Sequence, residues 1–213
     1  MTAPAWIRVQ YLSIILYLFD IVNYHLKDVW NKNKAMEIVI LRLGHRIDRD
    51  RRITAHVGLC ARALGARGMV LVGSDDSVVD TIQDVVDRWG GGFWVRDGAS
   101  WKKEITSWKE SGGKVLHLTM YGANLPTVID TIKEDRLMIV VGAEKVPPDL
   151  YRLADYNVAV TNQPHSEVAA LSIFLDRLQG GRELSLDFKG KTKIDGDVHC
   201  KGPKKHGKIN EPS

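Results

Sequence analysis

Polar residues that could bind a ligand follow three apolar runs in the second half of the chain. The segments are Val115–Gly122, Met138–Pro147 and Tyr156–Leu175. The apolar part of each is typical of a buried strand, and turn-forming or polar residues come next. Ligands of α/β sheets bind beyond the carboxyl ends of the strands. One such segment would be an ordinary connection, but three favour a site built from strand ends and loops.

The third segment is the most informative of the three. Val158-Ala159-Val160 predicts a short buried strand, which ends at the turn Thr161–Pro164. An apolar helical run begins after Glu167, and either Ser166 or Asn162 could cap it. Glu167 suits the positive end of that helix. The pattern therefore places polar groups where a strand ends and a helix begins.

A second chemical feature is the arginine density of Gly44–Arg52, which we expect to be a loop between a strand and a helix. Guanidinium groups match phosphate geometry, so this segment suits a phosphate-bearing ligand. Asp48 and Asp50 offset only part of the charge. His56, one turn after Arg52, is either an exposed helix histidine or a base. The arginines are Arg46, Arg49, Arg51 and Arg52, with Arg42 just before them.

Several common chemistries have no motif in the chain. It has no GxGxxG after a strand, no GxxxxGK[ST] and no GxSxG. Cys60 and Cys200 lie far apart without a CxxC pattern, so neither zinc nor a disulfide is expected, and a reduced, cytoplasmic setting fits. His165 and Glu167 are two residues apart at a helix start and do not make a metal pair.

The elements that must position these residues alternate between strand and helix. The 213 residues are 44% hydrophobic and 26% charged with a net charge of +4, as in an ordinary globular protein. The alternation predicts a mostly parallel sheet with helices on both faces. Predicted strands are 36–43, 68–72, 93–95, 114–118, 137–141 and 156–160, and predicted helices are 53–64, 77–89, 100–111, 125–132 and 148–153.

The two ends of the chain differ from this core. Residues 1–35 include the apolar run Tyr11–Val22, which is too short to span a membrane and contains Asp20. We interpret 1–35 as an extension outside the core, either upstream sequence wrongly included in the reading frame or a peripheral amphipathic helix. Residues 183–213 form a basic C-terminal extension in which Leu184–Phe188 could be a strand, and the rest a solvated tail or an exposed hairpin.

Four segments together resemble the archaeal tRNA (cytidine-56)-2′-O-methyltransferases of the SPOUT class. They are Leu41–Arg52, His117–Gly122, Val141–Pro147 and Asn157–Arg177. The resemblance implies a Rossmann-like parallel sheet with a C-terminal trefoil knot, over residues 36–182. It also implies S-adenosylmethionine as cofactor, tRNA as substrate and a homodimer in the cytoplasm, with neither a metal nor a membrane.

The resemblance further implies roles for individual residues in methyl transfer to the ribose 2′-hydroxyl of cytidine 56. Arg52 is the expected catalytic cation and His56 an alternative base, although the arginines could instead only steer RNA. Alternatives are a SPOUT enzyme for another RNA position, or a module that binds structured RNA without catalysis. RNA would contact Arg42, Arg46, Arg49 and Arg51. The cofactor would contact Leu118, Thr119, Met120, Tyr121, Gly122, Gly142, Ala143, Glu144, Lys145, Val146, Val160, Thr161, Asn162, Gln163, Pro164, His165, Ser166 and Glu167.

Overall fold

The structure is a computed structural model that describes residues 36–142, 146–194, 196 and 198. The chain divides into two units, Met1–Met36 and Glu37–Ser213, and the fold below belongs to the second. The predicted N-terminal extension, 1–35, lies outside the described residues. No helix in the described ranges is both long enough and apolar enough to cross a membrane.

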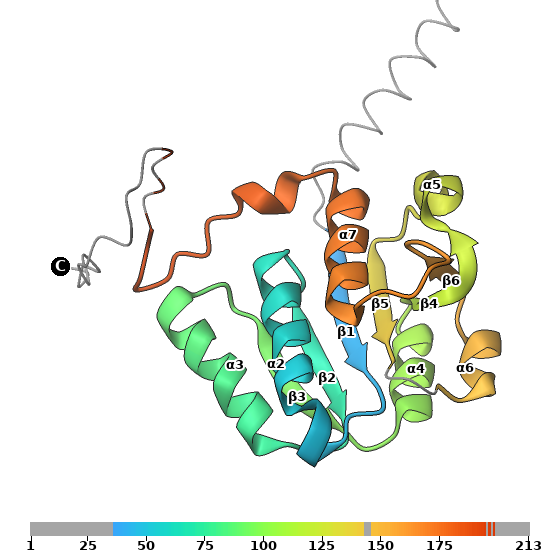
Figure 1. The fold of residues 1–213 in the computed structure, drawn as a ribbon, viewed down its shortest axis with the longest axis horizontal. Helices are drawn as coiled ribbons and strands as arrows, with labels where there is room; N and C mark the ends of the chain where they lie inside the picture. The colour runs from blue at the N-terminus through green and yellow to red at the C-terminus, as the bar shows by residue number, and fades with distance from the viewer. Residues whose placement is uncertain (1–35, 143–145, 195, 197, 199–213) are drawn as a thin grey trace, which may run out of the picture. The chain divides into compact units, whose positions relative to one another are not determined.

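Six parallel strands form one sheet in the order β3-β2-β1-β5-β4-β6 (Figure 1). Successive residues of the central strands point to opposite faces of the sheet. The apolar residues on both faces are buried, as a sheet covered on both sides requires. This agrees with the parallel α/β sheet expected from the sequence. The strands are β1 (Glu37–Arg42), β2 (Gly68–Val72), β3 (Trp94–Gly98), β4 (Lys114–Asn124), β5 (Arg136–Val141) and β6 (Tyr156–Ala159).

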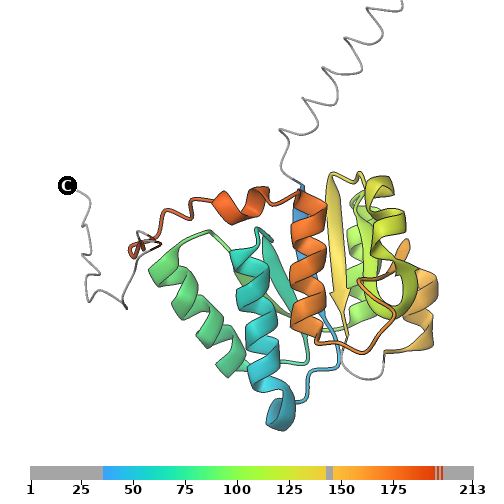
Figure 2. The same cartoon turned by 45° about the horizontal axis from the view of Figure 1, so that its top comes forward.

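Helices cover both faces of this sheet (Figures 1 and 2). On one face α2 packs between α3 and α7, and the three helices form one layer. On the other face, Ile105 of α4 and Leu150 of α6 pack against Val39 and Leu41 of β1. The helices are α2 (Ile47–Ala63), α3 (Asp76–Trp89), α4 (Trp101–Glu110), α5 (Leu125–Val128), α6 (Pro148–Leu153) and α7 (Glu167–Gln179), with 3₁₀ turns η1 (Ile129–Thr131) and η2 (Arg182–Ser185).

The helix predicted at 53–64 begins earlier, at Ile47, so most of the arginine-dense segment is helical. The Asp50 carboxylate explains the early start, because it accepts a hydrogen bond from the Arg46 backbone N–H at 3.2 Å, close to a helix end that needs acceptors. The Arg46 Nε–H also donates to Asp50 at 3.0 Å and holds the pKa of that carboxyl below its usual value. The arginines therefore project from the first turns of a helix.

Two further expectations are corrected by the structure. The strand predicted at 114–118 continues to Asn124, and its pairing with β6 slips between Leu118 and Ala123. The strand expected at Leu184–Phe188 is absent from the described residues. The 3₁₀ turn Arg182–Ser185 occupies part of it, and the backbone then makes only an isolated bridge between Lys189 and Gly90.

Candidate functional site

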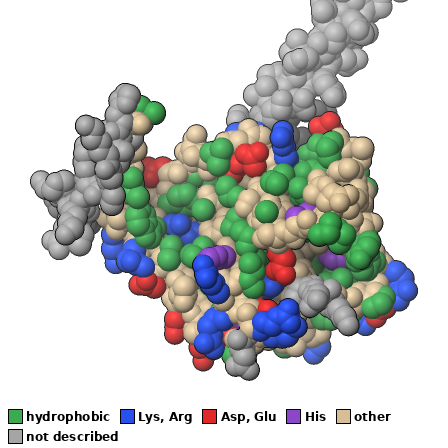
Figure 3. Space-filling model, viewed as in Figure 1, with side chains coloured by type: hydrophobic (Ala, Val, Ile, Leu, Met, Phe, Trp, Pro, Cys, Tyr) green, Lys and Arg blue, Asp and Glu red, His purple; other side chains and the backbone are tan. Residues whose placement is uncertain are grey.

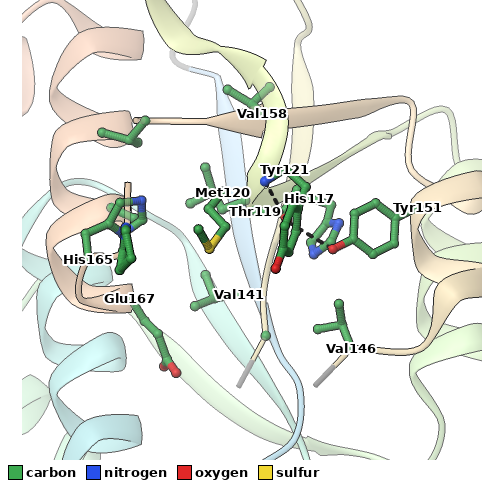
Figure 4. A pocket seen from close by; sticks show the side chains of 15 residues that line it. His117, Thr119, Met120, Tyr121, Val141, Val146, Tyr151, Val158, His165 and Glu167 are labelled. Carbon is green, nitrogen blue, oxygen red and sulfur yellow. Dashed lines mark hydrogen bonds between the residues drawn. The ribbon is translucent and has the colours of Figure 1, made fainter. Parts of the chain in front are cut away.

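A pocket of about 340 Å³ is lined by the middle of β4, by the ends of β5 and β6 with residues that follow them, and by residues of α6 and α7 (Figure 4). The three strands are neighbours in the parallel sheet, so these parts of the chain lie side by side. The lining residues are His117, Leu118, Thr119, Met120, Tyr121, Val141, Gly142, Val146, Tyr151, Val158, Val160, Pro164, His165, Glu167 and Ala170. The sequence segments singled out for their polar ends therefore form one cavity.

Two glycines let the chain segments around the pocket approach closely. A Cβ atom on Gly122 would lie 2.5 Å from the backbone C and O atoms of Asn157 and from the N atom of Val158. A Cβ atom on Gly142 would lie 2.1 Å from Cγ1 of Val146. Real Cβ atoms do not come this near to other heavy atoms, so a side chain at Gly122 would force backbone to move and one at Gly142 would displace the Val146 side chain.

One wall of the pocket carries a hydrogen-bonded polar cluster. Nδ1 of His117 lies 3.0 Å from Oδ1 of Asn157, whose amide N–H donates to the Tyr151 backbone oxygen at 2.8 Å. The Tyr151 hydroxyl pairs with Thr119 Oγ1 at 3.1 Å, and the His117 and Tyr151 rings meet edge to face. Burial lowers the pKa of His117, partly offset by the Asn157 contact. A neutral imidazole and two hydroxyls thus offer fixed hydrogen-bonding groups beside the cavity.

Apolar side chains form the remaining walls. In Figure 4, Met120 and Val141 lie on one side of the space and Tyr151 and Val146 on the other, and Val158 lies above them. Apolar walls with a few convergent polar groups are typical of small-molecule sites. The cavity can therefore hold a flat ring between apolar side chains while main-chain groups near Gly142 hydrogen-bond to its edge.

Ten of the residues expected to contact a cofactor line this pocket, and five other described ones do not. Asn162 instead donates to the backbone oxygens of Met120 and Gly122, at 2.7 and 3.2 Å. Ser166 is at the N-cap of α7 but makes no side-chain capping bond, so neither expected cap forms. The residues outside the lining are Gly122, Thr161, Asn162, Gln163 and Ser166, while Ala143, Glu144 and Lys145 lie outside the described residues.

The sequence reasoning did not select five of the lining residues. Those five are His117, Val141, Tyr151, Val158 and Ala170. Val141 and Val158 read as strand core, and His117 lies inside a predicted strand. Tyr151 lies on a short helix directly after Met138–Pro147. Its amphipathic side chain is the one signal that could have indicated a position in the pocket wall.

Basic side chains gather over the beginning of α2, at the same end of the sheet as the pocket (Figures 1 and 3). The side chains of Arg46, Arg49 and Arg51 are 48%, 66% and 55% exposed. Arg52 and His56, one helical turn apart, are also exposed, and neither lines the pocket. Their catalytic roles stay predictions, as do the RNA contacts of the other three arginines.

Arg42 corrects one expectation, because its side chain is wholly buried. Its Nη1 lies 2.5 Å from Oε2 of Glu167, which lines the pocket, and 3.5 Å from the Val141 backbone oxygen. Its Nε–H donates to Oγ1 of Thr54 at 3.3 Å. A guanidinium enclosed in this way cannot reach an RNA phosphate, so Arg42 belongs to the framework of the pocket. Within the described ranges, no group of three or more His, Cys, Asp or Glu side chains is placed to hold a metal.

Comparison with known proteins gives a consistent family. The family model described as tRNA ribose 2′-O-methyltransferase, aTrm56, matches residues 89–206. A protein of Methanothrix thermoacetophila named tRNA (cytidine(56)-2′-O)-methyltransferase is 59% identical over 160 residues, which are 75% of this chain and 92% of the relative. The chain belongs to the aTrm56 family. A Methanocella arvoryzae protein of the same name is 58% identical over 177 residues, 81% of this chain and 96% of that protein.

Solved structures support the fold of this aTrm56-family chain. A crystal structure of an RNA 2′-O ribose methyltransferase has a TM-score of 0.54 at 16% identity, covering 68% of this chain and 57% of that one. The SpoU methyltransferase AviRb from Streptomyces viridochromogenes, in complex with AdoMet, has a TM-score of 0.51 at 16% identity, covering 70% and 59%. At 16% identity these likenesses concern the fold alone, and they show that the sheet and its helices are arranged as in these two methyltransferase structures.

Proposed function

We propose that this aTrm56-family chain transfers a methyl group from S-adenosylmethionine to the ribose 2′-hydroxyl of cytidine 56 in tRNA. The observation that carries the proposal is the convergence of three strand-end segments on one pocket, beside the basic first turns of α2. Relatives that are 58–59% identical to this chain, and that match it over 92% and 96% of their own length, carry the corresponding name.

The residues of the pocket fit the donor. An adenosyl group needs apolar cover for its ring and main-chain partners for its edge, and Leu118, Met120 and Val160 with the backbone at Gly142 offer both. Thr119 and Tyr151 supply hydroxyls for the ribose. Among the described lining residues, Glu167 is the acidic one, and its carboxylate, which is paired with the buried Arg42, suits the cationic groups of the donor.

When bound, the donor supplies an electrophilic methyl group whose bond to sulfur breaks as the bond to oxygen forms. The chain must hold the 2′-hydroxyl in line with that methyl group. The hydroxyl proton must pass to a group of the chain or to solvent as the new bond forms. Arg52, exposed and without an ion-pair partner among the described residues, can stabilise the negative charge that develops on the oxygen. His56, one turn away, is the alternative group to receive the proton, while Arg46 and Arg49 contact phosphates.

Finer features of the proposal follow from the family. The C-terminal segment would thread through a loop of the chain as a trefoil knot, and the Asn162 bonds to Met120 and Gly122 are the contacts expected where two such segments cross. The protein would act as a cytoplasmic homodimer without a metal. Residues 36–182 would form the catalytic domain, and 183–213 a basic extension that contacts tRNA.

The test is transfer of label from S-[methyl-³H]adenosylmethionine to an unmodified tRNA transcript. The control transcript carries a 2′-O-methyl group already at position 56, so the proposed acceptor is blocked. Label on the first transcript and none on the second is the expected result. Label on a base, or equal label on both transcripts, would assign another methylation specificity. Binding of tRNA without any transfer would leave an RNA-binding module instead.

A further inference from the structure

A chain of buried polar contacts runs inward from the beginning of α2. The Nε–H of Arg51 donates to Oδ2 of Asp75 at 3.1 Å, and the same oxygen lies 3.1 Å from Nε2 of His45. The other ring nitrogen of His45, Nδ1, lies 3.0 Å from the hydroxyl oxygen of Thr54. Three segments, namely the residues before α2, the helix itself and the loop before α3, are thereby joined through one imidazole.

The chain of contacts continues from Thr54 to the pocket. The Thr54 oxygen accepts from Nε–H of Arg42 at 3.3 Å, and Nη1 of Arg42 lies 2.5 Å from Glu167. Because Glu167 lines the pocket, a series of six side chains leads from the exposed Arg51 to the cavity wall, with both ends included. In sequence order they are Arg42, His45, Arg51, Thr54, Asp75 and Glu167.

The charged groups fix the direction of the hydrogen bonds in which they take part. Ionised Asp75 only accepts, and its pKa is held far below its usual value, first by hydrogen bonds from Ser77 and then by Arg51 and His45. His45 therefore presents Nε2–H to Asp75, and its Nδ1 faces the Thr54 hydroxyl, whose oxygen also accepts from Arg42. Thr54 and His45 thus stand in the middle of the chain of contacts, whereas Asp75 is also held by Ser77, and Arg42 by Val141 and Glu167.

Burial of this chain of contacts is costly if stability is its only purpose. Thr54, Arg42 and the His45 side chain are 0% exposed, and the Asp75 side chain is 4% exposed. Well-packed apolar residues stabilise such places as well as buried ions do, whereas planar imidazole and guanidinium groups fix directions between segments. A role in holding two sites in register explains the polar residues better than a role in stability.

We propose that His45, Thr54 and Arg42 are positioning residues that hold the RNA-facing start of α2 in register with the donor pocket. The inference rests on the proposed function, because register matters only if α2 presents the acceptor and the pocket presents the methyl group. A misplacement of about 1 Å between reacting groups costs on the order of 10²-fold in rate. Breaking the chain of contacts therefore lowers kcat and leaves each half-site able to bind.

The sharpest test compares Thr54→Val, which has nearly the same shape but no hydroxyl, with Thr54→Ser, which keeps the hydroxyl. We expect Thr54→Val to lower kcat roughly 10- to 100-fold. The dissociation constants for S-adenosylmethionine and for tRNA stay close to those of the wild type. Thr54→Ser retains most of the wild-type kcat, a rescue that a purely structural role for the methyl group would not give.

Two further proteins complete the experiment. His45→Asn, which keeps a group near Nδ1 and loses the contact with Asp75, lowers kcat in the same selective way and serves if Thr54→Val does not fold. Glu104→Gln breaks the Arg96–Glu104 ion pair, which is 2.5 Å long, lies at the surface and is not part of the pocket lining, and leaves kcat unchanged.

The outcomes separate the inference from the proposed function. Wild-type kcat in both Thr54→Val and His45→Asn, or a fall in kcat matched by equal losses of both affinities, would overturn the inference alone. If the wild-type protein itself transfers no methyl group to tRNA, the proposed function fails and the inference falls with it.

Discussion

Substitution of Gly122 by alanine tests the closeness of β4 and β6 at the pocket. The added Cβ would lie 2.5 Å from three backbone atoms of Asn157 and Val158, and backbone cannot swing aside as a flexible side chain can. One of the two strands must move. Overpacking of this kind costs about 1–3 kcal/mol in free energy of unfolding. For a domain of this size that lowers Tm by roughly 2–12 °C.

Differential scanning calorimetry of Gly122→Ala beside the wild type measures the shift, and titration calorimetry measures the affinity for S-adenosylmethionine. We expect the affinity to fall too, because Met120 and Tyr121 of the same strand line the pocket. Gly196→Ala is the matched control, since its Cβ meets nothing within 4 Å. A Gly122→Ala protein with the Tm of the wild type would refute the argument that these backbones are in contact.

Three other perturbations have clear expected outcomes. Arg52→Ala should abolish methyl transfer to tRNA and leave the affinity for the donor nearly intact, and a fully active variant would exclude Arg52 as the catalytic cation. Burial lowers the pKa of His117, so the unfolded chain takes up that proton first, and stability falls as the pH drops below about 6.5. In urea titrations His117→Asn should lose this acid-side decline, and a variant that keeps the full decline would refute the assignment to His117. Deletion of Gly190–Ser213 should weaken tRNA binding and flatten its salt dependence, and an unchanged slope would show that the lysines of this segment do not contact RNA.

The sequence is sufficient to predict the architecture because its signals are local. Short apolar runs alternate with segments of helical periodicity, and this pattern predicted all six strands and the parallel sheet. They also indicated that the segments after β4, β5 and β6 meet, since strand ends of a parallel sheet share an edge. The continuation of β4 through Met120 and Tyr121 was missed because their strand character comes from pairing with β6 after a register slip, which local patterns do not reveal.

Burial of charge is the property that local patterns misjudge. Arg42 is the last residue of an apolar strand and precedes an arginine-dense segment, so its neighbours indicate a surface position. Its burial depends on Thr54 and Glu167, which only the fold brings to it. The same is true of His45, whose two partners come from α2 and the loop before α3. Expectations about single charged residues therefore need the tertiary partner, whereas expectations about strands do not.

The position of Arg42 also explains where the pocket lies in the sheet. The chain leaves β1 for β2 on one side and leaves β5 for β6 on the other, so the direction of its connections reverses between β1 and β5. Ligands of open α/β sheets bind outside such a reversal point. Here Arg42 and Val141 are register partners at the ends of β1 and β5, and the Arg42–Glu167 ion pair occupies the reversal point.

The cavity is consequently displaced toward β4 and β6. Val141 and Glu167 belong both to its wall and to the buried contacts that lead to α2. A change at the reversal point should therefore affect the donor pocket and the RNA-facing helix together, although neither ligand touches Arg42 in the proposed arrangement.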